Sequence, residues 1–301
     1  MKLRLLGPRY WPTWLAMLVL FVIAWLPFRL QLFLGRACGR LLRHLPLRSR
    51  RVAAINIDLC LPALDPAQRR RLLREHFENL GIALCETAVA WWRSDSTITA
   101  RSTLEGGQHL RAAAARGQGA IVLAAHFTTL EIGARILASH LPIHVVYRPS
   151  RNALLNAFLQ WRRGSQTLGA IKRDDIRSVI RALKQGKPVW YAPDQSFRWK
   201  GAAMVPLFGV PAPTNLATSR LAAMTGAAVL PYFVERLPGA GGYRAVIHAP
   251  LQDFPCDDPL HDARRMHELI ESEVRRMPAQ YLWVHRRFKQ LDATAPDRYA
   301  V

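Results

Sequence analysis

Cysteine is scarce in this chain, and its spacing excludes two kinds of architecture. The four cysteines, Cys38, Cys60, Cys85 and Cys256, form no C-x-x-C pair and no cluster with histidine at metal-ligand spacing. We therefore expect neither a zinc site nor a disulfide framework, and no metal or other cofactor. The same pattern favours a reducing compartment for the main domain.

Acidic residues are also scarce, and this shortage says more about partners than about fold. Asp and Glu number 21 against 42 Lys and Arg, which gives a formal net charge of +21 over 301 residues. Such a balance favours acidic partners: nucleic acid, an anionic membrane surface, a phosphorylated substrate or an acidic carrier protein. No helix-turn-helix, zinc-finger or RNA-binding sheet motif is present, so nucleic acid is the least supported of these.

One long stretch near the N-terminus lacks charge altogether. Residues 11–28 are uncharged, and about 18 residues at roughly 1.5 Å each reach about 27 Å, close to the hydrocarbon thickness of a bilayer. Trp11, Trp14 and Trp25 lie toward its ends, as in an aromatic belt. The pattern predicts a membrane-spanning anchor in residues 1–28. A cleaved signal peptide is the alternative, but no small-x-small cleavage site follows.

Residues 29–64 form a basic collar behind the predicted anchor. Its arginines outnumber Lys2, Arg4 and Arg9 ahead of the apolar run, a bias that keeps the following domain cytoplasmic. We expect residues 29–51 to lie along the anionic leaflet, with arginine stems in the interface and guanidinium groups on phosphate.

The rest of the chain, residues 65–301, has the pattern of a single α/β domain. Asp65 and Pro66 are typical of a helix start, and the apolar periodicity continues to Trp92. Further on, short apolar runs predict strands at 120–125, 143–147, 189–192, 228–234, 243–249 and 281–285. Helices are predicted near 108–116, 128–139, 152–168, 175–185, 215–225 and 258–277. This alternation indicates a mostly parallel or mixed sheet flanked by helices, with a hairpin turn at 238–242.

The most informative motif combines a buried strand, a histidine and a carboxylate. The strand at 120–125 delivers His126 into a turn, and Glu131 follows five residues later. A neutral imidazole can take a proton from a hydroxyl, and a carboxylate on its other nitrogen would orient it and stabilise the imidazolium. The spacing alone is weak evidence, because a chain with 10 His and 21 acidic residues contains several such pairs. A histidine that merely caps a strand is the alternative.

More polar side chains follow the ends of predicted strands or flank the helices between them, where ligands bind in open α/β sheets. They are Arg148, Arg163, Arg173, Asp194 and Asn215. Each has a plainer explanation. In so arginine-rich a chain, Arg148 and Arg163 can be solvated surface charges, and Asp194 can be a turn residue bonded to its own backbone.

Taken together, several motifs resemble one family. They are Ala125-His126-Phe-Thr-Thr-Leu-Glu131, Tyr147-Arg148-Pro149, Arg173-x-Asp175, Trp190-Tyr-Ala-Pro-Asp194, Val205-Pro-Leu-Phe-Gly209 and Gln280-Tyr-Leu-Trp-Val-His-Arg-Arg-Phe-Lys289. The chain resembles the late, lauroyl-type acyltransferases of lipid A biosynthesis from about residue 10 to 299. These belong to the lysophospholipid acyltransferase superfamily, and the resemblance implies a glycerolipid-acyltransferase-like mixed sheet flanked by helices.

The resemblance also implies an activity and a location. It implies an inner-membrane enzyme that moves a fatty acyl chain from acyl carrier protein to a hydroxyl of a Kdo-bearing lipid A precursor. On this match His126 is the base and Glu131 its orienter. Arg163 and Asp194 fall on positions that the family treats as functional, and the further substrate contacts would be Arg148, Arg173 and Asn215. Gln195 departs from relatives that carry histidine there, which puts that neighbouring contact in doubt.

The chemistry fits this assignment. The acceptor hydroxyl is a poor nucleophile, so a positioned imidazole can accelerate its attack on a thioester. Backbone N–H groups at the helix after His126, or an arginine, would stabilise the oxyanion. The acyl chain needs a dry groove, for which the helix at 66–92 and the segment 154–161 are candidates. Transfer to another membrane lipid is the alternative activity, and the C-terminal motif argues against it.

Overall fold

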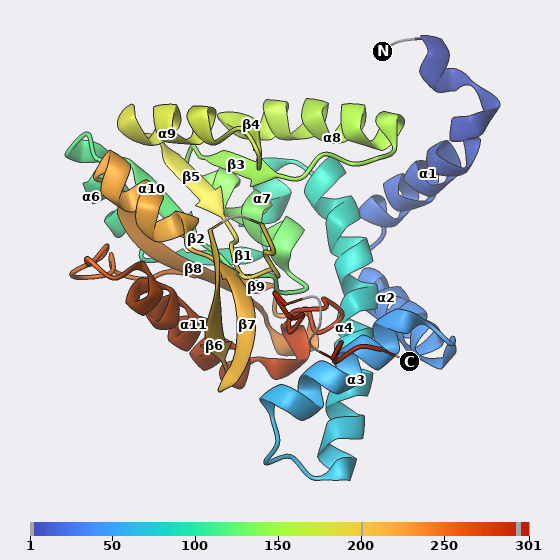
Figure 1. The fold of residues 1–301 in the computed structure, drawn as a ribbon. Coiled ribbons are helices and arrows are strands. Elements are labelled where there is room, and N and C mark those ends of the chain that lie inside the picture. The colour runs from blue at the N-terminus through green and yellow to red at the C-terminus, as the bar shows by residue number, and fades with distance from the viewer. Residues whose placement is uncertain (1–2, 200, 293–295, 301) are drawn as a thin grey trace.

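The computed structural model describes residues 3–199, 201–292 and 296–300. In these residues a seven-stranded sheet has the order β1-β9-β8-β2-β5-β3-β4 (Figure 1). Its strands are β1 (Ser102–Glu105), β2 (Ala120–Leu123), β3 (His144–Tyr147), β4 (Gly169–Lys172), β5 (Pro188–Tyr191), β8 (Ala228–Arg236) and β9 (Tyr243–Ile247). A separate antiparallel hairpin consists of β6 (Ala202–Leu207) and β7 (Val210–Asn215).

Helices cover both faces of the sheet and form the N-terminal quarter of the chain. They are α1 (Trp11–Trp25), α2 (Phe28–His44), α3 (Arg48–Cys60), α4 (Pro66–Trp92), α5 (Asp95–Thr99), α6 (Gly107–Ala115), α7 (Leu130–His140), α8 (Ala153–Gln166), α9 (Ile176–Lys184), α10 (Ala217–Thr225) and α11 (Pro259–Arg276). Short 3-10 helices are η1 (Leu3–Leu6), η2 (Pro8–Tyr10), η3 (Pro238–Ala240) and η4 (Pro278–Gln280).

The strand directions bring the carboxyl ends of several strands to one edge of the sheet. Strands β8 and β9 pair antiparallel, whereas β8-β2-β5-β3-β4 all pair parallel. The chain passes from β2 to β3, and β5 later inserts between them. The carboxyl ends of β2, β5, β3 and β4 therefore meet at one edge, which is where an open α/β sheet binds its ligands.

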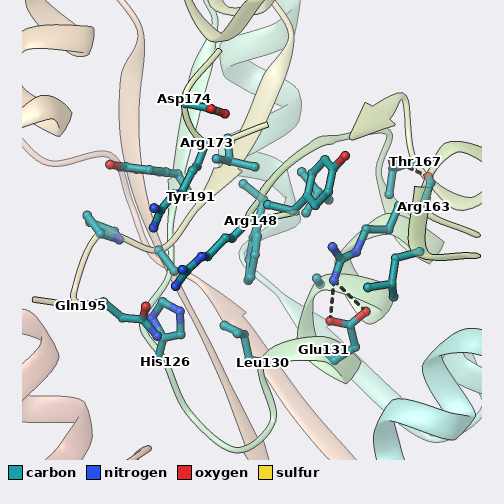
Figure 2. A pocket seen from close by; sticks show the side chains of 18 of the residues that line it. His126, Leu130, Glu131, Arg148, Arg163, Thr167, Arg173, Asp174, Tyr191 and Gln195 are labelled. Carbon is teal, nitrogen blue, oxygen red and sulfur yellow. Dashed lines mark hydrogen bonds and ion pairs between the residues drawn. The ribbon is translucent and has the colours of Figure 1, made fainter. Parts of the chain in front are cut away.

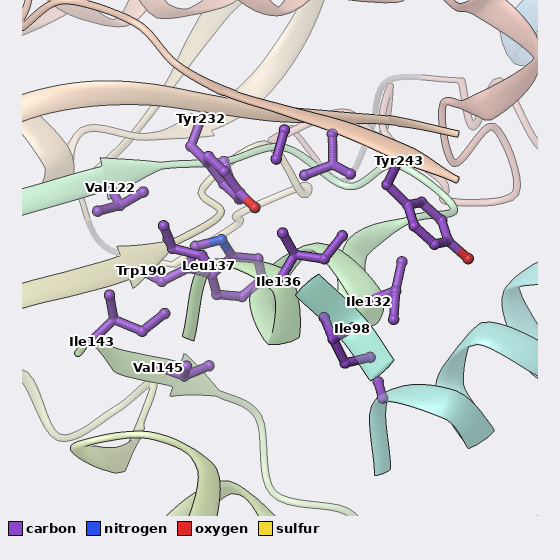
Figure 3. Packing of buried hydrophobic residues seen from close by; sticks show 14 of the residues in the cluster. Ile98, Val122, Ile132, Ile136, Leu137, Ile143, Val145, Trp190, Tyr232 and Tyr243 are labelled. Atoms are coloured by element: carbon purple, nitrogen blue, oxygen red, sulfur yellow. The ribbon is translucent and has the colours of Figure 1, made fainter. Parts of the chain in front are cut away.

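The central strands are buried on both faces, as their continuous apolar runs predict. On one face, Ile132, Ile136 and Leu137 of α7 pack against Val122 and Trp190 of the sheet (Figure 3). On the other face, the alternate side chains of β2 lie in a second cluster with residues of α9, α10 and α11: Ile121, Leu123, Val179, Leu183, Leu221 and Met266. The result is the expected layered α/β arrangement with a mixed, parallel-rich sheet.

The structure corrects the prediction that residues 1–28 form a membrane-spanning helix. Helix α1 has 15 residues and ends at Trp25, Leu26 is extended (φ −66°, ψ 155°), and α2 begins at Phe28 after Pro27. The buried Gln31 amide donates to the carbonyls of Ile23, Ala24 and Leu26 at 3.0–3.2 Å and so satisfies the end of α1. In the described part of the chain, no helix is long and apolar enough to cross a membrane.

The predicted basic collar contains two helices, and the first of them lies unusually close to α4. An added Cβ on Gly39 of α2 would lie 2.0 Å from the Phe77 carbonyl oxygen, and one on Gly81 of α4 would lie 2.0 Å from that of Gly35. Glycine at these positions therefore lets the two helix backbones touch.

Most sequence-predicted elements are confirmed, within a few residues at their ends. Asp65 caps α4 in a capping box with Gln68, and the turn at 238–242 joins β8 to β9. The predicted strand at 281–285 is wrong, because Tyr281 makes only an isolated bridge with Phe127 before the chain turns. Sequence patterns gave no sign of β1, β4 or the β6–β7 hairpin.

Candidate active site

Parallel register brings a histidine and an aspartate together at the sheet edge. Leu123 of β2 is paired with Tyr191 of β5, so His126 and Asp194 each lie three residues beyond that pair. The Nδ1 atom of His126 is 2.5 Å from Asp194 Oδ1, and the His126 backbone N–H donates to Oδ2 at 2.9 Å. Both the ring and the main chain of His126 are thus fixed by one carboxylate.

Asp194 is suited to hold a charge there. Its side chain is 2% exposed, whereas that of His126 is 18% exposed. Burial alone would raise the pKa of Asp194, but attraction to His126 and the two hydrogen bonds from His126 outweigh it and lower the pKa to about 2. An ionised Asp194 accepts a hydrogen bond from the Nδ1–H group of His126. The free lone pair of the neutral imidazole is then on Nε2.

Glu131 does not bond to His126, which corrects the predicted pairing. Its carboxylate accepts from Arg163 Nη2 at 2.9 and 3.2 Å and from the Trp91 indole N–H at 3.0 Å. Glu131 lies in the first turn of α7 and is turned toward α8, away from the imidazole (Figure 2). The helical turn after His126 directs this carboxylate elsewhere, and strand pairing supplies Asp194 instead.

A cavity of about 710 Å³ opens at this edge of the sheet. Its lining includes every predicted site residue except Asp194, which lies buried behind the imidazole: His126, Glu131, Arg148, Arg163, Arg173 and Asn215. The sequence-predicted residues therefore converge on one site, although they come from six different segments of the chain.

The cationic part of the cavity contains two kinds of arginine. Arg163 is ion-paired with Glu131, and Arg135 is ion-paired with Asp95. Arg148 and Arg173 follow β3 and β4 directly and are exposed, and the Arg173 N–H donates to the Tyr147 carbonyl at 2.9 Å. Within the described residues neither Arg148 nor Arg173 has an ion-pair partner.

Asn215 lies on the cavity wall, but its side chain is largely engaged within the protein. Its Oδ1 accepts from the Ala217 N–H at 3.0 Å, and its Nδ2 donates to the Tyr191 hydroxyl at 3.4 Å. These bonds fix the start of α10 beside β5.

The other part of the cavity is apolar and lies between the sheet, α4, α7 and α8. It is lined by Ala90, Ala134, Ala138, Val145, Leu159 and Trp190. Both segments that the sequence nominated for a dry groove contribute, α4 through Ala90 and the 154–161 segment through Leu159.

The C-terminal motif holds the His126 segment by main-chain pairing. The Thr128 N–H donates to the Gln280 carbonyl at 2.7 Å, and the Leu282 N–H donates to the His126 carbonyl at 2.9 Å. The Tyr281 hydroxyl lies 3.4 Å from Asp194 Oδ2. Sequence reasoning gave these residues no role in the site, and the only signal was the family-like motif itself.

The same motif also holds the loop that carries Asp194. His285 Nε2 accepts from the Ser196 N–H at 2.9 Å, and burial lowers the pKa of His285 to about 4, so the ring stays a neutral acceptor. Arg287 donates to the Pro213 carbonyl at 2.6 Å and to the Thr214 hydroxyl at 2.9 Å. The loop after β5 and the β6–β7 hairpin are thereby tied to the chain's C-terminal part.

Comparison with known proteins identifies the family. Residues 1–290 match the family model described as bacterial lipid A biosynthesis acyltransferase. The chain is 36% identical over 296 residues to the lipid A biosynthesis lauroyltransferase of Escherichia coli (strain K12), covering 98% of this chain and 97% of that protein. This chain belongs to the bacterial lipid A biosynthesis acyltransferase family.

Two other relatives agree with this assignment. Identity is 36% over 288 residues with the palmitoleoyltransferase of Escherichia coli (strain K12), covering 94% and 93% of the two chains. It is 34% over 296 residues with an acyltransferase of Haemophilus influenzae, covering 97% and 93%. The resemblance found from the sequence motifs is confirmed, and the chain is an acyltransferase of lipid A biosynthesis.

Proposed function

We propose that this acyltransferase moves a fatty acyl chain from acyl carrier protein to a hydroxyl of the acyl chains on a Kdo-bearing lipid A precursor. The observation that carries the proposal is the His126–Asp194 pair, which faces a cavity with one cationic and one apolar part. The cationic part suits an acceptor that carries phosphates and carboxylates, and the apolar part suits the donor's acyl chain. The acyltransferase domain would comprise residues 65–301.

In this mechanism His126 acts as the general base. Its Nε2 takes the proton of the acceptor hydroxyl as the hydroxyl oxygen attacks the thioester carbonyl carbon. The new C–O bond forms, the C–S bond breaks, and the thiol leaves with the proton. Asp194, rather than Glu131, would orient the imidazole and stabilise the imidazolium. General-base catalysis of this kind contributes about a hundred- to ten-thousandfold.

The negative charge that develops on the thioester carbonyl oxygen needs a hydrogen-bond donor to stabilise it. The N–H groups of Thr128 and Leu130 at the start of α7 already donate to the carbonyls of Gln280 and Phe127. These two N–H groups are therefore engaged, and Arg148, which extends into the cavity from the end of β3 (Figure 2), is our candidate for the donor.

The other polar residues of the cavity would bind substrate. Glu131 would hold Arg163 against the wall, which leaves the remaining N–H groups of that guanidinium for oxygen atoms of the acceptor. Arg173, free of an ion pair in the described residues, would attract the acceptor's anionic groups. Asn215 would contribute indirectly, because it fixes the Ala217 backbone and the Tyr191 side chain.

We also propose that the enzyme works at the cytoplasmic side of the bacterial inner membrane. One face of α1 carries an exposed apolar stripe of Trp11, Leu15, Leu18, Val22 and Trp25, each 54–63% exposed. On α2, Phe33 and Leu41 are both 65% exposed. Arginines of the same region would face lipid phosphates, so the stripe would lie in the lipid interface.

The test is transfer of a labelled acyl chain from acyl carrier protein to two acceptors across a salt series. We expect product on a Kdo-bearing tetra-acylated lipid A precursor and little on lysophosphatidic acid. Efficient acylation of lysophosphatidic acid, with none on the lipid A precursor at any salt concentration, would support the alternative membrane-lipid activity instead.

A further inference from the structure

Helix α9 presents a row of cations to solvent. Arg177, Arg181 and Lys184 recur at helical spacing and are all exposed, whereas Val179 and Leu183 on the opposite face are buried against the sheet. The row spans about 10 Å along the helix. Exposed Lys172 and Lys187 extend it at either end.

These cations are not neutralised within the described part of the protein. Arg177, Arg181 and Lys184 have no ion-pair partner there, in contrast to Arg163 and Arg135 of the neighbouring cavity. The nearest acidic residues in the sequence are Asp174 and Asp175, and Asp175 caps α9 by accepting from the Ser178 N–H at 3.1 Å. The row therefore keeps a net positive charge.

The row begins at the cavity. Ile176, the first residue of α9, and Arg173, three residues before it, both line the cavity, as does the exposed Trp199. Figure 1 shows α9 at one side of the molecule and α1 and α2, which carry exposed apolar side chains, at the other. A protein bound along α9 would not compete with a lipid surface bound along α1 and α2.

We infer that the α9 row, Arg177, Arg181 and Lys184, is the docking surface for the acidic carrier protein that delivers the acyl thioester. This rests on the donor named in the proposed function. Opposite charges would accelerate encounter and orient the carrier, so that its thioester arm enters the cavity past Ile176. The interaction is exposed and should weaken with salt.

The test compares two matched double charge reversals, R177E/R181E on α9 and R70E/R74E near the start of α4. Both pairs are exposed arginines four residues apart on a helix, so the change in net charge is identical. We expect R177E/R181E to raise the KM for acyl carrier protein thioester by about tenfold or more at low salt. The KM for an acyl-pantetheine thioester, which lacks the protein, should stay as in the wild type. R70E/R74E should change neither value.

Turnover of acyl-pantetheine also shows that the variant is folded. An unchanged KM for the carrier protein thioester in R177E/R181E would overturn the docking surface. So would a rise in the KM for the lipid acceptor alone, because the cations would then bind lipid. If the wild-type enzyme used acyl-pantetheine but no carrier protein thioester, the proposed donor itself would be wrong, which is a separate result from any failure of the variants.

Discussion

At the scale of single residues, the imidazole is paired by strand register and not by sequence proximity. His126 and Asp194 are 68 positions apart, yet they occupy equivalent positions beyond paired strands. Glu131, five positions from His126, is turned toward Arg163. The sequence predicted both carboxylates as site residues, but only the pairing of β2 with β5 decides which of them contacts the base.

This difference predicts an order of severity among variants. H126A and D194N should each lower kcat by about a hundredfold or more, because the base or the charge that stabilises its imidazolium is lost. E131Q should leave kcat much less affected and should raise the KM for the acceptor, since Arg163 loses its ionic support. Steady-state kinetics of the three variants tests this order, and their melting temperatures show whether each variant is folded. Near wild-type kcat in folded D194N, with severe loss of kcat in E131Q, would restore Glu131 as the orienter.

Two buried histidines, His76 and His267, and the half-buried His285 predict how stability depends on pH. Burial is the largest cause that lowers the pKa of His76, His267 and His285, in each case to about 4. Unfolded histidine titrates near 6.5, so between about pH 4 and 6.5 the unfolded chain binds more protons than the folded one. Stability should therefore be full above about pH 6.5 and fall toward pH 4.

Urea unfolding at pH 7.5 and 5.5 tests this, and the midpoint should be lower at pH 5.5. The variant H76F removes one titrating group at a fully buried position next to Phe77. Its midpoint should change less between the two pH values. An equal or higher midpoint at pH 5.5 in the wild type would contradict the buried neutral state.

At the scale of elements, periodicity predicted those parts of the fold that are long or fully buried. Strands β1 and β4 are as long as β2, but they lie at the two edges of the sheet and are mostly exposed or half-buried, so they carry no continuous apolar run. The run 281–285 has strand-like residues, but its carbonyl and N–H groups bond to the His126 segment and to Asn56 instead of to a ladder. Pairing partners, which a single sequence does not display, explain these errors.

The α2–α4 contact gives a prediction about glycine. G81A should lower the free energy of unfolding by about 1–3 kcal/mol, because its Cβ would lie 2.0 Å from the Gly35 carbonyl oxygen and the helices must separate. The control is G164A in α8, where nothing lies within 4 Å of the new Cβ. There alanine should stabilise the helix by about 0.5–1 kcal/mol. Equal stabilisation by both substitutions, measured by denaturant unfolding, would show that the helices do not touch there.

At the scale of the whole molecule, the cationic row of α9 and the exposed apolar stripe of α1 lie on different sides (Figure 1). The cavity and α9 carry cations without ion-pair partners in the described residues, and α1 and α2 present exposed apolar side chains on another side (Figure 1). The net charge of +21 indicated acidic partners, but composition does not say where each partner binds. The length of the uncharged run at 11–28 predicted a single spanning helix. The helix breaks at Leu26 and Pro27 because of local backbone geometry, which average hydropathy over the run does not show.

The exposed stripe of α1 predicts how the enzyme binds lipid. In L15S/L18S/V22S, three side chains that are 54–63% exposed become polar without loss of core packing. Each buried aliphatic side chain contributes about 1.5–3 kcal/mol, so binding to anionic vesicles should fall at least a hundredfold. The loss should persist at high salt, where the contribution of the arginines is screened. A control variant, M224S on α10, removes an apolar side chain that is 58% exposed away from the stripe and should bind as the wild type does. Vesicle co-sedimentation at low and high salt measures both. If the triple variant stayed with vesicles at high salt, another surface would have to hold the enzyme on lipid, and the stripe on α1 would have no part in it.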